Sequence, residues 1–453
     1  MQSNPFAFIL LVKRAAQAPF AQGHLNNFYL KRTVSSMAST TSQQGNSGGA
    51  AGRIWVHRPY QITPAPSSSA SSGKPIISNC RLPKSTPHSP PEAKLHYMHA
   101  SSSTPGKFLE DAYQSKVDFY KTQFHERVSK EARERIDRRT IQSPHDLGKV
   151  DVTVYFPEEK DATQNVMHPK LHGICLHVHG GGWLWGDSYH QVAHRCLEMA
   201  DALNVAVVSV EYSLFTKNNS NSMHFDPVND VSIAIDWIEN NGAIDLDAHA
   251  SFVASGESSG AHLLLLAMLI RRDRESKVNF LPPVPLPPIN SSPQSQSATT
   301  LPSWKCLNLV YGIYDISGTP SLRADGDSSS PLCGNDLLWM YEMYYNKVQE
   351  AKNANGEDTF DRQHPSVSAL YANLSHMPPA LFTVGSADPL LDDSLFMANK
   401  YSAYGNHVEL AIYEGGEHGI GHFIQEEEDM GVRARRHTLD FMKQHLNLHK
   451  THN

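Results

Sequence analysis

Paired cysteines are missing from this 453-residue sequence. Its five cysteines are odd in number and widely spaced, and none forms a C-x-x-C pair, so neither a disulfide framework nor a zinc site is indicated. Cys175 and Cys306 fall in apolar, strand-like runs, where a small thiol packs as a hydrophobic side chain. Unpaired thiols fit a reducing compartment.

Long hydrophobic runs are absent as well. No stretch of about 18 apolar residues occurs, so we expect no membrane-spanning helix. The short apolar run at residues 6–12 has no positive charge before it and is followed by Lys13 and Arg14. That is the wrong polarity for a secretory signal.

Acidic residues are lacking from residues 1–91, which contain nine Lys or Arg residues. An acid-free, Ser-rich start of this kind is typical of a mitochondrial transit peptide, and a disordered tail explains it equally well. Met37 is an alternative start that would remove the candidate signal. A cytoplasmic and a mitochondrial location therefore both stay open.

The rest of the chain is acidic. When the nine basic residues of the N-terminal segment are set aside, 30 Lys and Arg residues stand against 46 Asp and Glu residues, a net charge of −16. Such a body repels phosphate groups, and we find no basic stripe interleaved with aromatic residues. We expect no nucleic-acid partner.

Composition divides the chain into three parts. Residues 1–91 are predicted to be a disordered or targeting segment, because residues 36–91 are mostly Ser, Pro, Gly, Thr and Ala and cannot offset chain entropy by apolar burial. Residues 92–149 are predicted to be helical, with apolar residues at helical spacing between about 106 and 140. Residues 150–453 form the main domain, with a Pro- and Ser-rich insertion at 275–303.

From residue 150 onward, strands alternate with helices. This pattern predicts an α/β fold with a mostly parallel central sheet and helices on both faces. Helices are predicted at residues 190–203, 228–240 and 261–272. The seven clearest strands are VDVTVYF (150–156), ICLHVHG (174–180), VAVVSVEY (205–212), FVASGE (252–257), CLNLVYG (306–312), ALFTVGS (380–386) and VELAIYEG (408–415).

The pentapeptide GESSG at 256–260 is centred on Ser258 and lies between a predicted strand and the apolar helix AHLLLLAMLI. This order is typical of a nucleophile elbow, a sharp turn that needs small residues two positions before and after the serine. Such a turn places the Ser258 hydroxyl at the carboxyl edge of the sheet, beside a helix N-terminus that favours developing negative charge.

A second glycine-rich segment, HGGGW at 179–183, ends an earlier predicted strand. Consecutive glycines allow backbone N–H groups to turn inward and hold an oxyanion. A plain glycine turn is the alternative, and the position upstream of an elbow favours the oxyanion loop. Trp183 and Trp185 either line the substrate pocket or belong to a packed loop.

A nucleophilic serine in this setting needs an acid further along the chain. Asp388 closes the predicted strand at 380–386, so its side chain should lie at the same sheet edge as Ser258. Asp392 and Asp393 lie a turn later, where carboxylates usually stabilise a helix start. We therefore predict that Asp388 is the acid.

The base is predicted to be His418, in the glycine-rich loop after the last strand. The chain has 25 histidines, and position after that strand is what selects this one. His422 is its close rival.

These motifs resemble the hormone-sensitive-lipase-like branch of the α/β-hydrolase superfamily, which includes carboxylesterases and arylacetamide-deacetylase-type enzymes. The resemblance covers about residues 150–445 and implies an α/β-hydrolase fold whose cap is supplied by the helices before residue 150. It also implies that the oxyanion donors are the N–H groups of Gly181, Gly182 and Ser259. Besides HGGGW and GESSG, it rests on EYSL (211–214), FDPVND (225–230), YGIYDISGTPS (311–321), HPSVSALYANL (364–374), VGSADPLLDD (384–393) and HGI (418–420).

The chain departs from the family pattern at three places. The usual GDSAG reads GESSG, with Glu257 and Ser259 at the changed positions, and neither change removes a catalytic group. The stretch after EYSL lacks the common APE, which leaves the shape of the substrate pocket open. HGI replaces the usual HGF.

The sequence thus predicts a serine hydrolase that cleaves carboxylic esters of small or medium hydrophobic substrates through an acyl-enzyme on Ser258. The expected partner is a small-molecule ester, and no metal or organic cofactor is needed. An amidase, formamidase or deacetylase with the same triad is one alternative. A non-catalytic ligand-binding receptor and a scaffold built on the N-terminal segment are two others. The natural substrate and the oligomeric state stay open.

Overall fold

The structure is a computed structural model of the whole chain. All the residues that it describes belong to one compact unit, residues 50–453. They are residues 53–57, 105–143, 148–158, 171–215, 226–240, 244–276, 304–325, 332–356, 359–419 and 430–446.

A single sheet of nine strands organises the described residues, in the order β1-β9-β8-β7-β6-β4-β5-β3-β2. Neighbouring strands are parallel, except that β3 is antiparallel to both β2 and β5. The strands are β1 (Arg53–His57), β2 (Ile136–Gln142), β3 (Lys149–Tyr155), β4 (Leu171–Val178), β5 (Ala206–Glu211), β6 (Leu246–Glu257), β7 (Trp304–Val310), β8 (Ala380–Gly385) and β9 (Val408–Tyr413).

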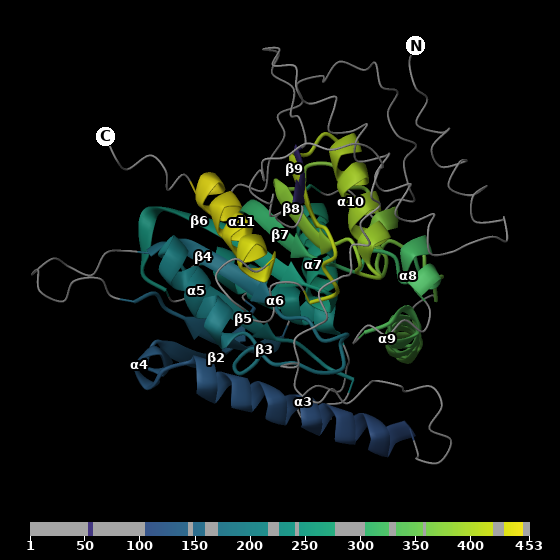
Figure 1. The fold of residues 1–453 in the computed structure, drawn as a ribbon, viewed down its shortest axis with the longest axis horizontal. Helices are drawn as coiled ribbons and strands as arrows, with labels where there is room; N and C mark the ends of the chain where they lie inside the picture. The colour runs from purple at the N-terminus through teal and green to yellow at the C-terminus, as the bar shows by residue number, and fades with distance from the viewer. Residues whose placement is uncertain are drawn as a thin grey trace, which may run out of the picture. The chain divides into compact units, whose positions relative to one another are not determined.

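Helices cover both faces of this sheet (Figure 1). Successive strand residues face opposite sides, so that Ile174 and Leu176 of β4 join one core cluster while Cys175 between them joins the other. The helical elements are α3 (Pro105–Arg127), α4 (Lys130–Arg133), α5 (Ala193–Leu203), α6 (Pro227–Glu239), α7 (Ser259–Ser276), α8 (Pro320–Asp325), α9 (Gly334–Asn355), the 3-10 turn η1 (Ala369–Tyr371), α10 (Leu391–Ala403) and α11 (Met430–His445).

The two core clusters divide these helices between the faces. Residues of α6, α7, α9 and α10 pack into the larger cluster, and residues of α5 and α11 pack into the smaller one. The predicted α/β architecture is therefore confirmed, as are the seven predicted strands and the three predicted helices.

The N-terminal segment needs a correction. Residues 1–91 were expected to be disordered or to serve in targeting, yet residues 53–57 form β1, which pairs in parallel with β9 along the whole of its length. The short run RIWVH contains β-branched and aromatic residues that favour strands, and the Ser- and Pro-rich sequence around it hides this signal. The other residues of this segment lie outside the described part.

A second correction concerns residues 92–149, which were expected to be helical. Helices α3 and α4 are present, but residues 136–142 form the edge strand β2, so the sheet begins before residue 150. Sequence reasoning missed this strand because its charged residues resemble an exposed helix face, and charged residues are also typical of exposed sheet edges. At the predicted insertion, α7 extends to Ser276, and residues 277–303 lie outside the described part.

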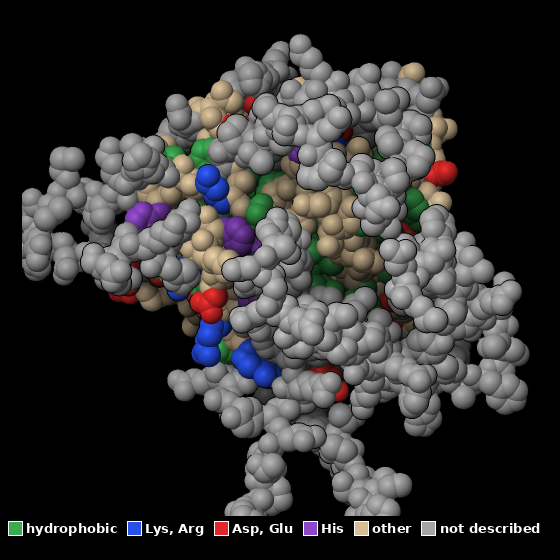
Figure 2. All heavy atoms as spheres, turned by 90° about the horizontal axis from the view of Figure 1, so that it is seen from above, with side chains coloured by type: hydrophobic (Ala, Val, Ile, Leu, Met, Phe, Trp, Pro, Cys, Tyr) green, Lys and Arg blue, Asp and Glu red, His purple; other side chains and the backbone are tan. Residues whose placement is uncertain are grey.

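On the face drawn in Figure 2, Lys and Arg side chains are visible at a few separate places, and some of them lie beside an Asp or Glu side chain. No helix in the described ranges is both long enough and apolar enough to cross a membrane.

Candidate active site

Ser258 occupies the turn between β6 and α7. Strand β6 ends at Glu257 and α7 begins at Ser259, and the backbone of Ser258 has a positive φ of +53°, which is uncommon for a residue other than glycine. Its N–H donates to the carbonyl oxygen of Val310 at 2.9 Å, which fixes the turn against β7. A sharp, strained turn of this type is the geometry of a nucleophile elbow.

The glycine two positions after the serine, Gly260, is required by close packing. A Cβ atom on Gly260 would lie 2.2 Å from the carbonyl oxygen of Val178 and 2.4 Å from that of His179. The first turn of α7 therefore rests directly on the end of β4, which brings the elbow beside the HGGGW segment.

The structure brings the three predicted triad residues together. Ser258 Oγ lies 3.0 Å from His418 Nε2, and His418 Nδ1 lies 3.0 and 3.1 Å from the two carboxylate oxygens of Asp388. Ser258, Asp388 and His418 follow β6, β8 and β9, whose carboxyl ends meet at one edge of the parallel sheet. With the proton on Nδ1, the imidazole donates to Asp388 and its Nε2 can accept the hydroxyl proton of Ser258.

Burial separates this set from bulk water. The side chain of Asp388 is fully buried, and 10 % of the His418 side chain is exposed. Ser258 is also buried, with 6 % of its surface exposed. A nucleophile and base in such a site interact more strongly than they would in water.

The rival carboxylates are engaged elsewhere. Asp393 accepts hydrogen bonds from the backbone N–H groups of Tyr314 and Asp315 and from the hydroxyl of Thr319, at 2.7 to 3.0 Å. Burial raises the pKa of Asp393 to about 7, and the three hydrogen-bond donors act in the opposite direction by stabilising the charged carboxylate. Asp392 accepts from the N–H of Ser321 at 2.8 Å. Both residues lie in the first turn of α10, as the sequence predicted. The rival histidine, His422, lies outside the described residues.

The HGGGW segment forms a tight loop next to the elbow. Gly181 and Gly182 have positive φ angles of +132° and +61°. A Cβ atom on Gly181 would lie 2.1 Å from the carbonyl oxygen of Trp185, and one on Gly182 would lie 2.5 Å from Met340 Sδ. Neither of these two glycine N–H groups donates to another described residue, so both are available to a bound oxyanion.

Ser259 has a contact that the sequence did not reveal. Its Oγ accepts a hydrogen bond from the N–H of Trp183 at 3.4 Å, which links the elbow to the glycine loop. The usual alanine of GDSAG has no hydroxyl and could not make this bond. The sequence shows serine in place of the usual alanine at this position, but it does not show that the serine hydroxyl binds Trp183.

Trp183 belongs to the protein core. It is fully buried, its ring stacks on Tyr344 of α9 at 4.4 Å, and it meets His262 edge-on at 5.2 Å. Trp183 therefore belongs to a packed loop, which is one of the two interpretations that the sequence left open. Sequence reasoning missed α9 and therefore the contact between Met340 and the glycine loop.

Helix α3 lies along the segment that follows the glycine loop. Phe124 packs against the rings of Tyr189 and His190 at 4.8 and 5.4 Å, and the ammonium group of Lys116 lies 5.9 Å from the ring centre of Trp185. Within the described residues, α3 also contacts α5, the helix that follows this segment. The predicted role of this helix in setting substrate size stays a prediction.

The chain is similar to known proteins over much of its length. A family described as "alpha/beta hydrolase fold" matches residues 175–422. An acetyl esterase from Salmonella schwarzengrund is 23% identical over 288 residues, which cover 63% of this chain and 73% of the esterase. An acetyl esterase from Salmonella choleraesuis is 24% identical over 288 residues, which again cover 63% of this chain and 73% of the esterase.

Solved structures agree on the fold. An esterase from Pyrobaculum calidifontis superimposes with a TM-score of 0.55 at 21% identity, covering 76% of this chain and 94% of that one. A thermostable esterase from Pseudomonas putida ECU1011 gives the same TM-score and identity over 76% and 93% of the two chains. The chain belongs to the α/β-hydrolase fold family, in its hormone-sensitive-lipase-like branch, and is an esterase-type hydrolase of that family.

Proposed function

We propose that this chain hydrolyses carboxylic esters of small or medium hydrophobic substrates through an acyl-enzyme on Ser258. The observation that carries the proposal is the continuous chain of contacts from Ser258 Oγ to His418 Nε2 and from His418 Nδ1 to Asp388, with distances of 3.0 to 3.1 Å. These are hydrogen-bond distances, so proton transfer needs no rearrangement.

In the first step, His418 Nε2 takes the hydroxyl proton as Ser258 Oγ attacks the ester carbonyl carbon. Asp388 holds the imidazole in the correct tautomer and stabilises the imidazolium that forms. The carbonyl electrons move to oxygen, giving a tetrahedral oxyanion. His418 then donates its proton to the leaving alcohol, and the acyl group stays on Ser258.

The oxyanion would be held by backbone N–H groups of Gly181, Gly182 and Ser259. The two glycine N–H groups donate to no other described residue, and Ser259 opens α7, whose N-terminus favours negative charge. Donors fixed in this way before the reaction stabilise the transition state more than they stabilise the substrate.

In the second step, His418 takes a proton from water, and the resulting hydroxide attacks the acyl-enzyme. Collapse of the second tetrahedral oxyanion returns the proton to Ser258 Oγ and releases the carboxylic acid. The residues named here supply every proton transfer of the cycle.

Amide hydrolysis by the same residues is the second candidate, because the acyl chemistry is shared and only the leaving group differs. The acetyl esterases among the relatives favour an ester substrate. A non-catalytic receptor is disfavoured because serine, histidine and acid are all retained at hydrogen-bond distances.

The test is a panel of p-nitrophenyl esters of increasing acyl length, with p-nitroanilides of the same acyl groups as matched substrates. We expect Ser258-dependent turnover of the short and medium esters, and much slower turnover of the anilides. Ser258→Ala provides the background rate. Faster turnover of the anilides would replace the ester proposal by the amidase, and equal rates for wild type and Ser258→Ala would refute both.

A further inference from the structure

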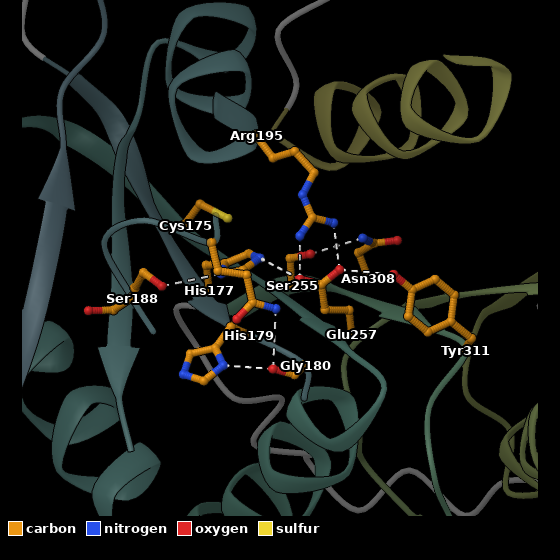
Figure 3. A network of polar contacts seen from close by, with 12 residues as sticks. Cys175, His177, His179, Gly180, Ser188, Arg195, Ser255, Glu257, Asn308 and Tyr311 are labelled. Atoms are coloured by element: carbon orange, nitrogen blue, oxygen red, sulfur yellow. Dashed lines mark hydrogen bonds and ion pairs between the residues drawn. The ribbon is translucent and has the colours of Figure 1, made fainter. Parts of the chain in front are cut away.

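A buried ion pair lies directly behind the elbow (Figure 3). Glu257, the residue before Ser258, receives two hydrogen bonds of 2.5 Å from the guanidinium group of Arg195 in α5. Only 4 % of the Glu257 side chain and 12 % of the Arg195 side chain are exposed. The free-energy cost of removing two charges from water is about as large as the attraction between them. Stability therefore does not explain a buried ion pair at this position, and we look for another role.

A third side chain binds the same carboxylate. The hydroxyl of Tyr311 donates to Glu257 Oε2 at 3.0 Å, and Figure 3 shows Arg195 and Tyr311 meeting the carboxylate from different sides. Glu257 therefore holds one residue from α5 and one from the segment after β7. All three side chains are almost inaccessible to solvent, so water does not compete strongly for these bonds.

Tyr311 in turn lies against the proposed base. The rings of Tyr311 and His418 are 4.7 Å apart at an interplanar angle of 59°. Among the described residues, His418 contacts Ser258 at Nε2, Asp388 at Nδ1 and the ring of Tyr311. The third contact restrains the ring against tilting out of line with the two hydrogen bonds.

The backbone of Tyr311 is strained in a way that fits this task. Its φ of +36° is positive, which is costly for an aromatic residue, and its N–H donates to the carbonyl oxygen of Thr383 in β8 at 2.6 Å. Strain of this kind persists where the surroundings fix the residue, and it gathers at functional sites.

We infer that the Glu257–Arg195 pair and Tyr311 are positioning residues that hold the imidazole of His418 in line with Ser258 and Asp388. The inference rests on the proposed function. The glutamate that departs from the usual GDSAG has one methylene more than aspartate, and here it reaches both Arg195 and the Tyr311 hydroxyl. We refer to these three side chains as the Glu257 brace.

The test uses the full chain with the variants Tyr311→Phe, Glu257→Asp and the double variant. Tyr311→Phe keeps the ring and removes only the bond to Glu257, whereas Glu257→Asp keeps the charge and shortens its reach. Tyr401→Phe is the matched control, because Tyr401 is equally buried and its hydroxyl donates to the Pro378 carbonyl oxygen at 2.6 Å, outside the triad. Two readouts are taken: kcat and KM on p-nitrophenyl acetate, and the low-field proton resonance of the His418–Asp388 hydrogen bond, assigned by its loss in His418→Ala.

For Tyr311→Phe we expect kcat to fall roughly 10- to 100-fold with KM within about twofold, because displacement of a reacting group by about 1 Å has effects of this size. For Glu257→Asp we expect changes in kcat and KM of the same size. The double variant should be little worse than the poorer single variant, because both changes break one connected unit. The low-field resonance should broaden in all three and stay unchanged in Tyr401→Phe.

Unchanged kcat and resonance in Tyr311→Phe would overturn the inference, as would losses that multiply in the double variant. Equal losses in Tyr401→Phe would also overturn it, since they would indicate general loosening. If the wild-type chain shows no Ser258-dependent turnover, the proposed function fails, and the resonance still decides whether the Glu257 brace orders His418.

Discussion

His262, on the first turn of α7, lies with its Nε2 2.8 Å from the carbonyl oxygen of Val367. The bond fastens the helix that begins at the elbow to the segment that precedes η1. Burial lowers the pKa of His262 to about 4, because the ring is fully buried and the hydrogen bond to Val367 offsets only part of the cost of charging it. The folded protein therefore holds this histidine neutral at and above pH 6.

Stability should depend on pH through His262. Its pKa is lower in the folded state than the ordinary 6.5, so between pH 6.5 and 4 the unfolded chain binds the extra proton. The free energy of unfolding should fall by about 2 kcal/mol between pH 7.5 and pH 5 from this group alone. Urea unfolding at the two pH values measures the difference.

His262→Gln is the control, because the amide can still donate to Val367 but cannot take up a proton in this range. We expect the loss of stability between the two pH values to shrink by about 2 kcal/mol in this variant. An identical pH dependence in wild type and variant would show that His262 is not the group responsible.

Substitution of the two rival histidines separates their roles. His418→Ala should lower kcat on p-nitrophenyl acetate by roughly 10⁴- to 10⁶-fold, because the proton of Ser258 then has no acceptor. His422→Ala should change kcat by less than about threefold. Steady-state kinetics on the purified variants decide the matter, and the reverse order of effects would exclude the assignment of His418 as base.

The glycine loop should tolerate no side chain. Gly181→Ala places a Cβ atom 2.1 Å from the Trp185 carbonyl oxygen, which must displace the proposed oxyanion donors. We expect kcat to fall by roughly 10²- to 10³-fold, the range for loss of one such donor. Gly405→Ala is the matched control, since Gly405 also has a positive φ, of +81°, but its Cβ would meet nothing within 4 Å. Near-normal kcat in Gly181→Ala would argue against the oxyanion assignment.

The edge strand β1 should contribute to stability. A chain that starts at residue 52 keeps β1, and one that starts at residue 61 loses its five paired positions with β9. At about 1 kcal/mol for each net backbone hydrogen bond, the shorter chain should be less stable by roughly 2–4 kcal/mol. Thermal melting of the two chains gives the comparison, and equal melting temperatures would show that β1 adds no stability.

Much of the fold was predictable because the central strands are buried on both faces and appear as apolar runs. The two strands that were missed, β1 and β2, lie at the edges of the sheet, where short or charged sequences give a weak signal. Helix α9 was also missed, although it packs Met340 against Gly182 and Tyr344 against Trp183.

The candidate triad was predictable because each member follows a recognisable strand, and parallel strands bring their carboxyl ends together. The Glu257 brace was not. Arg195, Glu257 and Tyr311 come from α5, β6 and the segment after β7, and no spacing in the sequence relates them. Glu257 stood out only as a departure from the usual aspartate, and its partners required the three-dimensional arrangement.

Covalent labelling tests the central claim most directly. The full chain is incubated with a fluorophosphonate, which forms a stable adduct with an activated serine, and the labelled peptide is identified by mass spectrometry. We predict a single adduct on Ser258, its absence in Ser258→Ala, and strongly slowed labelling in His418→Ala. An adduct on another residue, or unchanged labelling of Ser258→Ala, would contradict the assignment of Ser258 as the nucleophile.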